Sequence, residues 1–137
     1  MKIIKKEILI AAPAAKVWEH ITDSNKIAGW WKPNDFAPSV GQAFTIQCGS
    51  GHPVTGVVQE IVPLRKLSYT FRSAVVPVDT LVTFTLVEEG SQTRLTLVHS
   101  GWDALPPDKQ NVSNDFENGW GTLLPIIQQQ LAGAEAK

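Results

Sequence analysis

The chain has 137 residues, of which 43% are hydrophobic and 18% are charged, as is usual for one soluble globular domain. Its formal net charge of −1, spread evenly along the chain, argues against nucleic acid as a partner. The single cysteine cannot form an internal disulfide. The absence of a secretory signal and of any apolar run of about 18 residues indicates a cytoplasmic protein without a membrane span.

A strand and two short helices are expected in the first part of the chain. Residues 2–11 interleave isoleucine and leucine with charges, which is typical of a strand. Residues 13–21 are expected as a short amphipathic helix, because a proline in the first helical turn needs no N–H there. Thr22 or Asp23 can cap a second short helix that runs through Trp30.

Apolar and polar side chains then alternate in a series of short segments, which is typical of antiparallel strands with one buried face. The second face is rich in threonine, as at Thr70, Thr83, Thr85 and Thr96. The expected strands cover residues 44–48, 54–62, 67–71, 82–86 and 95–99, with turns at 49–53, 63–66 and 89–91.

Apolar residues recur at steps of three and four near the C-terminus, which predicts a long helix over roughly residues 107–132. Pro125 lies inside it and should kink it near Gly121. A glycine in a helix costs about 1 kcal/mol relative to alanine. We therefore expect Gly119 and Gly121 to allow a close approach, so that Gly119→Val would clash with the sheet or with Trp102.

This order of elements predicts an α+β fold that forms a single domain over residues 1–137. An antiparallel sheet needs its apolar face covered, and only the C-terminal helix is long enough to cover it. We therefore expect a curved antiparallel sheet of about six strands wrapped around this helix, with the two short helices closing one end.

Three stretches, APAAKVWEHITDSNKIAGWW, TRLTLVHSGW and NGWGTLLPIIQQQL, resemble the heat-shock-protein-90 ATPase activator homologue-like family. That family belongs to the Bet v 1-like or START-like superfamily, also known as the polyketide cyclase (SRPBCC) superfamily. The resemblance implies a helix-grip fold, often with an internal apolar cavity. Members of the superfamily bind lipids, sterols or polyketides, and some are cyclases or hydrolases.

The expected function is therefore a small cytoplasmic binding protein that holds an apolar or amphipathic small molecule between the sheet and the long helix. No metal, cofactor or catalytic residue is expected, and the protein should be a monomer or a weak homodimer. The expected cavity lining is Trp30, Trp31 and His99 at the mouth, with Phe44, Ile46, Tyr69, Phe71, Phe84, Leu97, Phe116, Trp120 and Leu124 inside.

The polar candidates give no clear reaction chemistry. His20, His52 and His99 are too scattered for a metal site, and Cys48 is expected to be a buried strand cysteine. His99 keeps three possible roles: a structural histidine at a strand end, a group that orients a ligand, or a catalytic group.

Two other function classes stay open. One is a co-chaperone that stimulates the heat-shock protein 90 ATPase, for which the threonine-rich outer face offers no large apolar docking patch. The other is a cyclase or hydrolase, for which only His99 and Asp103 could supply titratable groups; Asp103 and Asp108 are otherwise expected to be solvated loop carboxylates.

Overall fold

A computed structural model describes residues 3–47, 53–73, 76–106, 108 and 112–135 of the chain, with side chains up to residue 131. In chain order, the described elements are β1 (Ile4–Ile10), α1 (Ala14–Thr22), α2 (Ser24–Trp30), β2 (Ala43–Ile46), β3 (Val54–Val62), β4 (Lys66–Phe71), β5 (Thr80–Glu89), β6 (Gln92–Ser100), the short 3₁₀ helix η1 (Trp102–Ala104) and α3 (Val112–Glu135).

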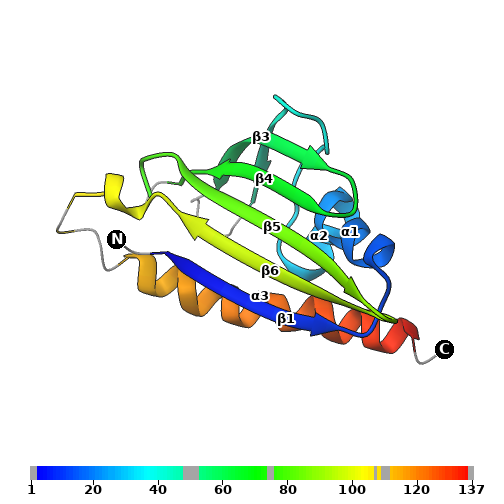
Figure 1. Cartoon of the computed structure of the whole chain (residues 1–137). Coiled ribbons are helices and arrows are strands. Elements are labelled where there is room, and N and C mark those ends of the chain that lie inside the picture. Colours follow the sequence, from blue (N-terminus) through cyan, green and yellow to red (C-terminus); the bar gives the residue numbers. More distant parts are fainter. Residues whose placement is uncertain (1–2, 48–52, 74–75, 107, 109–111, 136–137) are drawn as a thin grey trace.

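Within the described part of the chain, six strands form one antiparallel sheet in the order β1-β6-β5-β4-β3-β2. The first strand therefore pairs with the last, while β2 to β6 follow one another as neighbours. The sheet curves along α3, and α1 and α2 lie together at one end (Figure 1). This arrangement is the predicted helix-grip fold, and the α+β class is confirmed.

Local chemistry explains where the two short helices begin. The N-terminus of α1 has no side-chain cap from Pro13; instead the Ala14 N–H donates to Glu88 Oε2 on β5, at 3.0 Å. Of the two predicted caps for α2, Asp23 performs this role, because its Oδ1 accepts from the backbone N–H groups of Asn25 and Lys26. Thr22 instead donates back to the Trp18 carbonyl.

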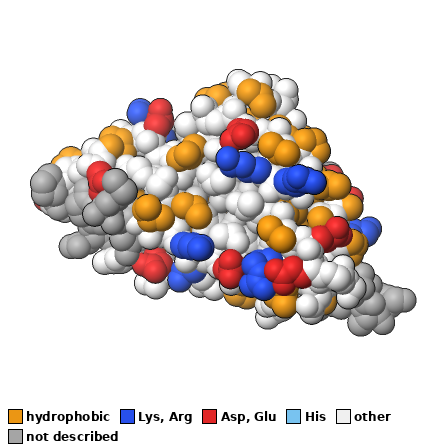
Figure 2. Space-filling model, in the orientation of Figure 1, with side chains coloured by type: hydrophobic (Ala, Val, Ile, Leu, Met, Phe, Trp, Pro, Cys, Tyr) orange, Lys and Arg blue, Asp and Glu red, His pale blue; other side chains and the backbone are white. Residues whose placement is uncertain are grey.

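The alternation of buried and exposed positions follows the sequence closely. Along β6, Leu95, Leu97 and His99 are buried, whereas Thr96 and Val98 between them are half-buried. The outer face of the sheet shows scattered apolar side chains among charged and polar ones (Figure 2). None of the described helices combines the length and apolar character that a membrane crossing requires.

The structure differs from the sequence-based expectation at the long helix. The described helix α3 runs from Val112 to Glu135, whereas residues 107 and 109–111 of the predicted start lie outside the described residues. The expected close approach at Gly119 is wrong, because a Cβ placed there would have nothing within 4 Å. A Cβ at Gly121 would reach only the flexible end of Lys6, at 3.8 Å.

Candidate functional site

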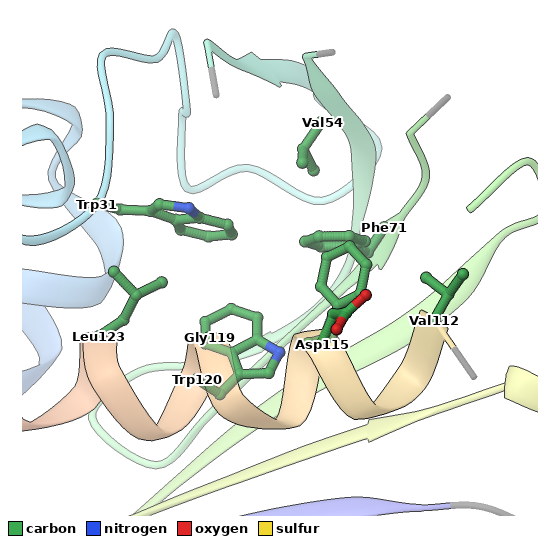
Figure 3. Close-up of a pocket in the computed structure, with 9 residues that line it drawn as sticks. Trp31, Val54, Phe71, Val112, Asp115, Gly119, Trp120 and Leu123 are labelled. Atoms are coloured by element: carbon green, nitrogen blue, oxygen red, sulfur yellow. The ribbon is translucent and has the colours of Figure 1, made fainter. Parts of the chain in front are cut away.

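A pocket of about 390 Å³ lies between α3, the start of β3 and the segment that follows α2 (Figure 3). Asp115 is exposed, and most of the other residues around the pocket are half-buried, so the pocket communicates with solvent. The described residues that line it are Trp31, Val54, Phe71, Val112, Asp115, Phe116, Gly119, Trp120 and Leu123.

Four aromatic rings form most of the pocket wall. Trp31 and Phe71 are stacked, with ring centroids 6.2 Å apart and 11° between the planes. Trp120 meets Trp31 edge to face at 5.0 Å, and Phe116 meets Phe71 in the same way at 5.3 Å. Such offset and edge-to-face contacts are the favoured geometries for aromatic pairs. The rings therefore hold one another in place around the pocket.

A buried hydrogen-bond network fixes two of these walls from behind. The Thr80 hydroxyl donates to the Phe71 carbonyl at 2.8 Å, so its oxygen accepts from His99 Nε2–H at 2.7 Å. The Trp120 indole N–H donates to His99 Nδ1 at 3.1 Å. These partners require a neutral His99 with its proton on Nε2.

The surroundings of His99 keep it neutral. Its side chain is fully buried, and desolvation lowers its pKa from 6.5 to about 3. Both ring nitrogens are occupied by Thr80 and Trp120, so neither faces the pocket. The contacts of His99 are therefore those of a residue that positions Phe71 and Trp120.

The Gly101-Trp102 sequence closes this network at the end of β6. Gly101 adopts a φ of 95°, which favours glycine, and a Cβ there would lie 3.2 Å from Thr80 Cα. The chain turns at this point and places Trp102 against His99, with ring centroids 4.4 Å apart. The Trp102 indole N–H donates to the His99 carbonyl at 3.0 Å. The pairs Gly101-Trp102 and Gly119-Trp120 thus bring both indoles to one histidine.

The structure divides the predicted lining residues into two groups. Trp31, Phe71, Phe116 and Trp120 surround the pocket. The others belong to the buried core, where they pack among themselves and against the pocket walls; Phe44 and Tyr69, for example, are 5.0 Å apart and edge to face. The core group is Trp30, Phe44, Ile46, Tyr69, Phe84, Leu97, His99 and Leu124.

Two residues expected at the mouth lie deeper than predicted. His99 is buried by Trp102, Trp120 and Phe71. Trp30 is buried too, because its indole N–H donates to the His20 carbonyl at 2.6 Å and so ties α2 to α1. Of the adjacent tryptophans, Trp31 is therefore the one at the pocket.

Five described lining residues were missed by the sequence reasoning: Val54, Val112, Asp115, Gly119 and Leu123. Four of them share one face of α3 with Phe116 and Trp120, at helical spacings of three and four. This periodicity could have revealed them. Val54 begins β3, and its place at the pocket depends on how the sheet packs against α3, which its sequence neighbours do not indicate.

The site offers little reaction chemistry among the residues that the structure describes. Asp115 is the only titratable side chain of the described lining. Asp103 and Asp108 are exposed and lie outside that lining. No group of histidine, cysteine or carboxylate side chains suited to a metal ion occurs in the described ranges; Cys48 and His52 lie outside them.

The fold and the aromatic pocket together define a small ligand-binding protein of the helix-grip class. Residues 11–132 match the family model described as Activator of Hsp90 ATPase homolog 1-like protein, and the chain belongs to this family. No curated protein is significantly similar to it.

Several solved structures share the fold over nearly the whole chain. Protein MLL2253 from Mesorhizobium loti is 29% identical, with a TM-score of 0.87 over 96% of this chain and 97% of that one. Protein BH1534 from Bacillus halodurans is 31% identical, with a TM-score of 0.79 over 96% and 97%. The Aha1 dimer from Colwellia psychrerythraea is 20% identical, with a TM-score of 0.79 over 96% of both chains.

Proposed function

We propose that the protein binds an apolar or amphipathic small molecule in the pocket between α3 and the sheet. The observation that carries this proposal is the pocket of about 390 Å³ with four aromatic walls. Small-molecule sites occupy roughly 300–1,000 Å³ and are lined mainly by apolar and aromatic side chains. The network through His99 supports the proposal, because it fixes Phe71 and Trp120 before any ligand arrives.

The predicted lining residues have two roles in this proposal. Trp31, Phe71, Phe116 and Trp120 contact the ligand, whereas the eight buried residues support those walls. We further propose that residues 1–137 act as one helix-grip unit in the cytoplasm, as a monomer or a weak homodimer and without a cofactor.

Gly119 provides a sharp test of the pocket. Gly119 lines the pocket, and a Cβ there meets nothing within 4 Å, so Gly119→Leu should fill the space that a ligand needs. Leucine also favours helix over glycine by up to about 1 kcal/mol, so the variant should fold at least as stably. We expect the uncharged fluorescent probe phenylnaphthylamine to bind the unaltered protein and to bind Gly119→Leu about tenfold or more weakly.

The matched control is Gly121→Leu, two residues along α3. Gly121 is exposed, outside the described lining, and its Cβ would touch only Lys6. This variant should keep the probe affinity of the unaltered protein, with both stabilities measured by urea unfolding. Equal probe binding by all three proteins would contradict the pocket proposal.

The family match supports a second candidate function, a co-chaperone that stimulates the ATPase of heat-shock protein 90. Such a role needs a docking surface, and the outer sheet face offers charges with isolated apolar side chains (Figure 2). The ATPase rate of purified heat-shock protein 90, with and without a molar excess of this protein, decides the question. An unchanged rate would reject this candidate and leave the pocket proposal untouched.

A further inference from the structure

The described pocket lining carries negative charge and no positive charge. Among its residues, Asp115 is the only charged side chain, and none is lysine, arginine or histidine. The His99 ring behind the wall is neutral, as its hydrogen bonds require. Aromatic rings carry partial negative charge on their faces, which attracts cations. The four rings and the carboxylate therefore both favour a positively charged ligand.

Asp115 is positioned to meet a ligand. It lines the pocket from α3 together with Val112, Gly119 and Trp120, and Figure 3 shows these residues along the helix. Its side chain is exposed to solvent. Within the described part of the chain, no cation forms an ion pair with it.

Among the described residues, the cations Lys6 and Arg72 have other partners. Lys6 Nζ on β1 lies 3.8 Å from Glu117 Oε2, two residues beyond Asp115 on α3. Arg72, which follows Phe71, donates to Asp79 at 3.0 Å. Neither side chain belongs to the described lining.

We infer that the ligand is a cationic amphiphile: an alkyl or aromatic body held between the rings, with a positively charged amine directed at Asp115. This inference rests on the proposed pocket and adds the chemical class of its ligand. A carboxylate or phosphate ligand of the same size would place its charge against Asp115 and the ring faces, and would bind more weakly.

Three probes with the same alkyl chain test the preference: octyltrimethylammonium, octanol and octanoate. Their dissociation constants are measured by calorimetry at low ionic strength, below micelle formation. We expect octyltrimethylammonium to bind best and octanoate worst. Asp115→Asn should lower the ratio of the octyltrimethylammonium affinity to the octanoate affinity about fivefold. One exposed charge pair contributes a change of about two- to threefold, and the two probes change in opposite directions. Octanol binding should stay unchanged.

Asp103→Asn is the matched control, because it removes the same charge from an exposed aspartate outside the described lining. It should leave all three affinities unchanged. Asp115 also lies in the first turn of α3, where a carboxylate favours the helix dipole. A purely structural role would therefore lower the stability of Asp115→Asn without narrowing the affinity ratio.

Two outcomes overturn the inference in distinguishable ways. Equal affinity for octanoate and octyltrimethylammonium, or an unchanged ratio in Asp115→Asn, rejects the cationic ligand; the pocket survives if Gly119→Leu still blocks octanol. Failure of all three probes to bind rejects both the cationic ligand and the proposed pocket.

Discussion

At the scale of single residues, His99 is a structural residue that links several elements through hydrogen bonds. Its ring accepts a hydrogen bond from Trp120 on α3 and donates one to Thr80 on β5, and its carbonyl accepts one from Trp102 in η1. Thr80 in turn donates to the carbonyl of Phe71 on β4. One imidazole therefore ties three neighbouring strands to the helix that they hold.

His99→Leu should destabilise the protein by about 2–3 kcal/mol, because the buried Trp120 N–H then has no acceptor. Trp120→Phe removes that donor, so the double variant should be less destabilised than the sum of the single variants, by about 1 kcal/mol. Urea unfolding of the four proteins gives this coupling free energy.

Trp30→Phe provides the control for this cycle. Its indole N–H donates to the His20 carbonyl and not to His99. Combined with His99→Leu it should give additive losses, within about 0.5 kcal/mol. Additive losses in the Trp120 cycle as well would show that the Trp120–His99 hydrogen bond contributes no coupling.

At the scale of elements, β3 is held unusually close to its neighbours at Gly56. A Cβ on Gly56 would lie 2.0 Å from the Thr70 carbonyl oxygen and 2.7 Å from Phe44 Cζ. The side chain of Thr70 also accepts from the Val57 N–H at 2.8 Å. A side chain at position 56 would therefore force β3 to move away from Thr70 on β4 or Phe44 on β2.

Gly56→Ala should destabilise the protein by about 3 kcal/mol, the upper end for overpacking, because one of the crowded atoms is backbone. Gly29→Ala on α2 is the matched control. Its Cβ would meet only Gln130 Nε2, at 3.7 Å, so it should be neutral or stabilising by up to about 1 kcal/mol. Equal urea midpoints for the two variants would contradict the crowding at Gly56.

Local patterns predicted the elements well but not their contacts. The cap at Asp23 and the alternation along β6 depend on neighbours in sequence, so they could be read directly. The environment of Gly119 depends on the separation between α3 and the segment after α2, which no local pattern contains. For that reason the expected clash at Gly119 was wrong and the pocket was placed too deep.

At the scale of the whole molecule, the fold was predictable because the order of elements leaves one helix able to cover the sheet. The pocket was only partly predictable. Buried aromatics such as Phe44 and Tyr69 have the same sequence pattern as Phe71, but they fill space with one another. Which aromatics leave room for a ligand is decided by packing across elements.

Buried histidines also give the molecule a pH dependence of stability. His99 is neutral when folded, with a pKa of about 3, whereas its pKa in the unfolded chain is near 6.5. The unfolded state therefore binds more protons between these values. The contribution of the neutral His99 to the free energy of unfolding is fully present above about pH 6.5 and is lost as the pH falls toward 3. Burial also lowers the pKa of His20, which acts in the same direction.

We expect the free energy of unfolding to fall by about 2 kcal/mol from about pH 7 to about pH 5, before exposed carboxylates titrate. Urea unfolding at several pH values measures this loss. The histidine ring signals in nuclear magnetic resonance should show His99 unprotonated down to about pH 4. A His99 that titrates near 6.5, or a stability that is flat over this range, would contradict the buried neutral imidazole.

The aromatic wall has a spectroscopic consequence. Trp31 and Trp120 are 5.0 Å apart at an interplanar angle of 66°, close enough for their excited states to couple. Such a pair contributes a signed band to the near-ultraviolet circular dichroism spectrum. A molecule that enters between α3 and Trp31 changes the angle or the surroundings of this pair. The circular dichroism band of this tryptophan pair should therefore change when a ligand occupies the pocket, and unlabelled ligands can be screened by their effect on it.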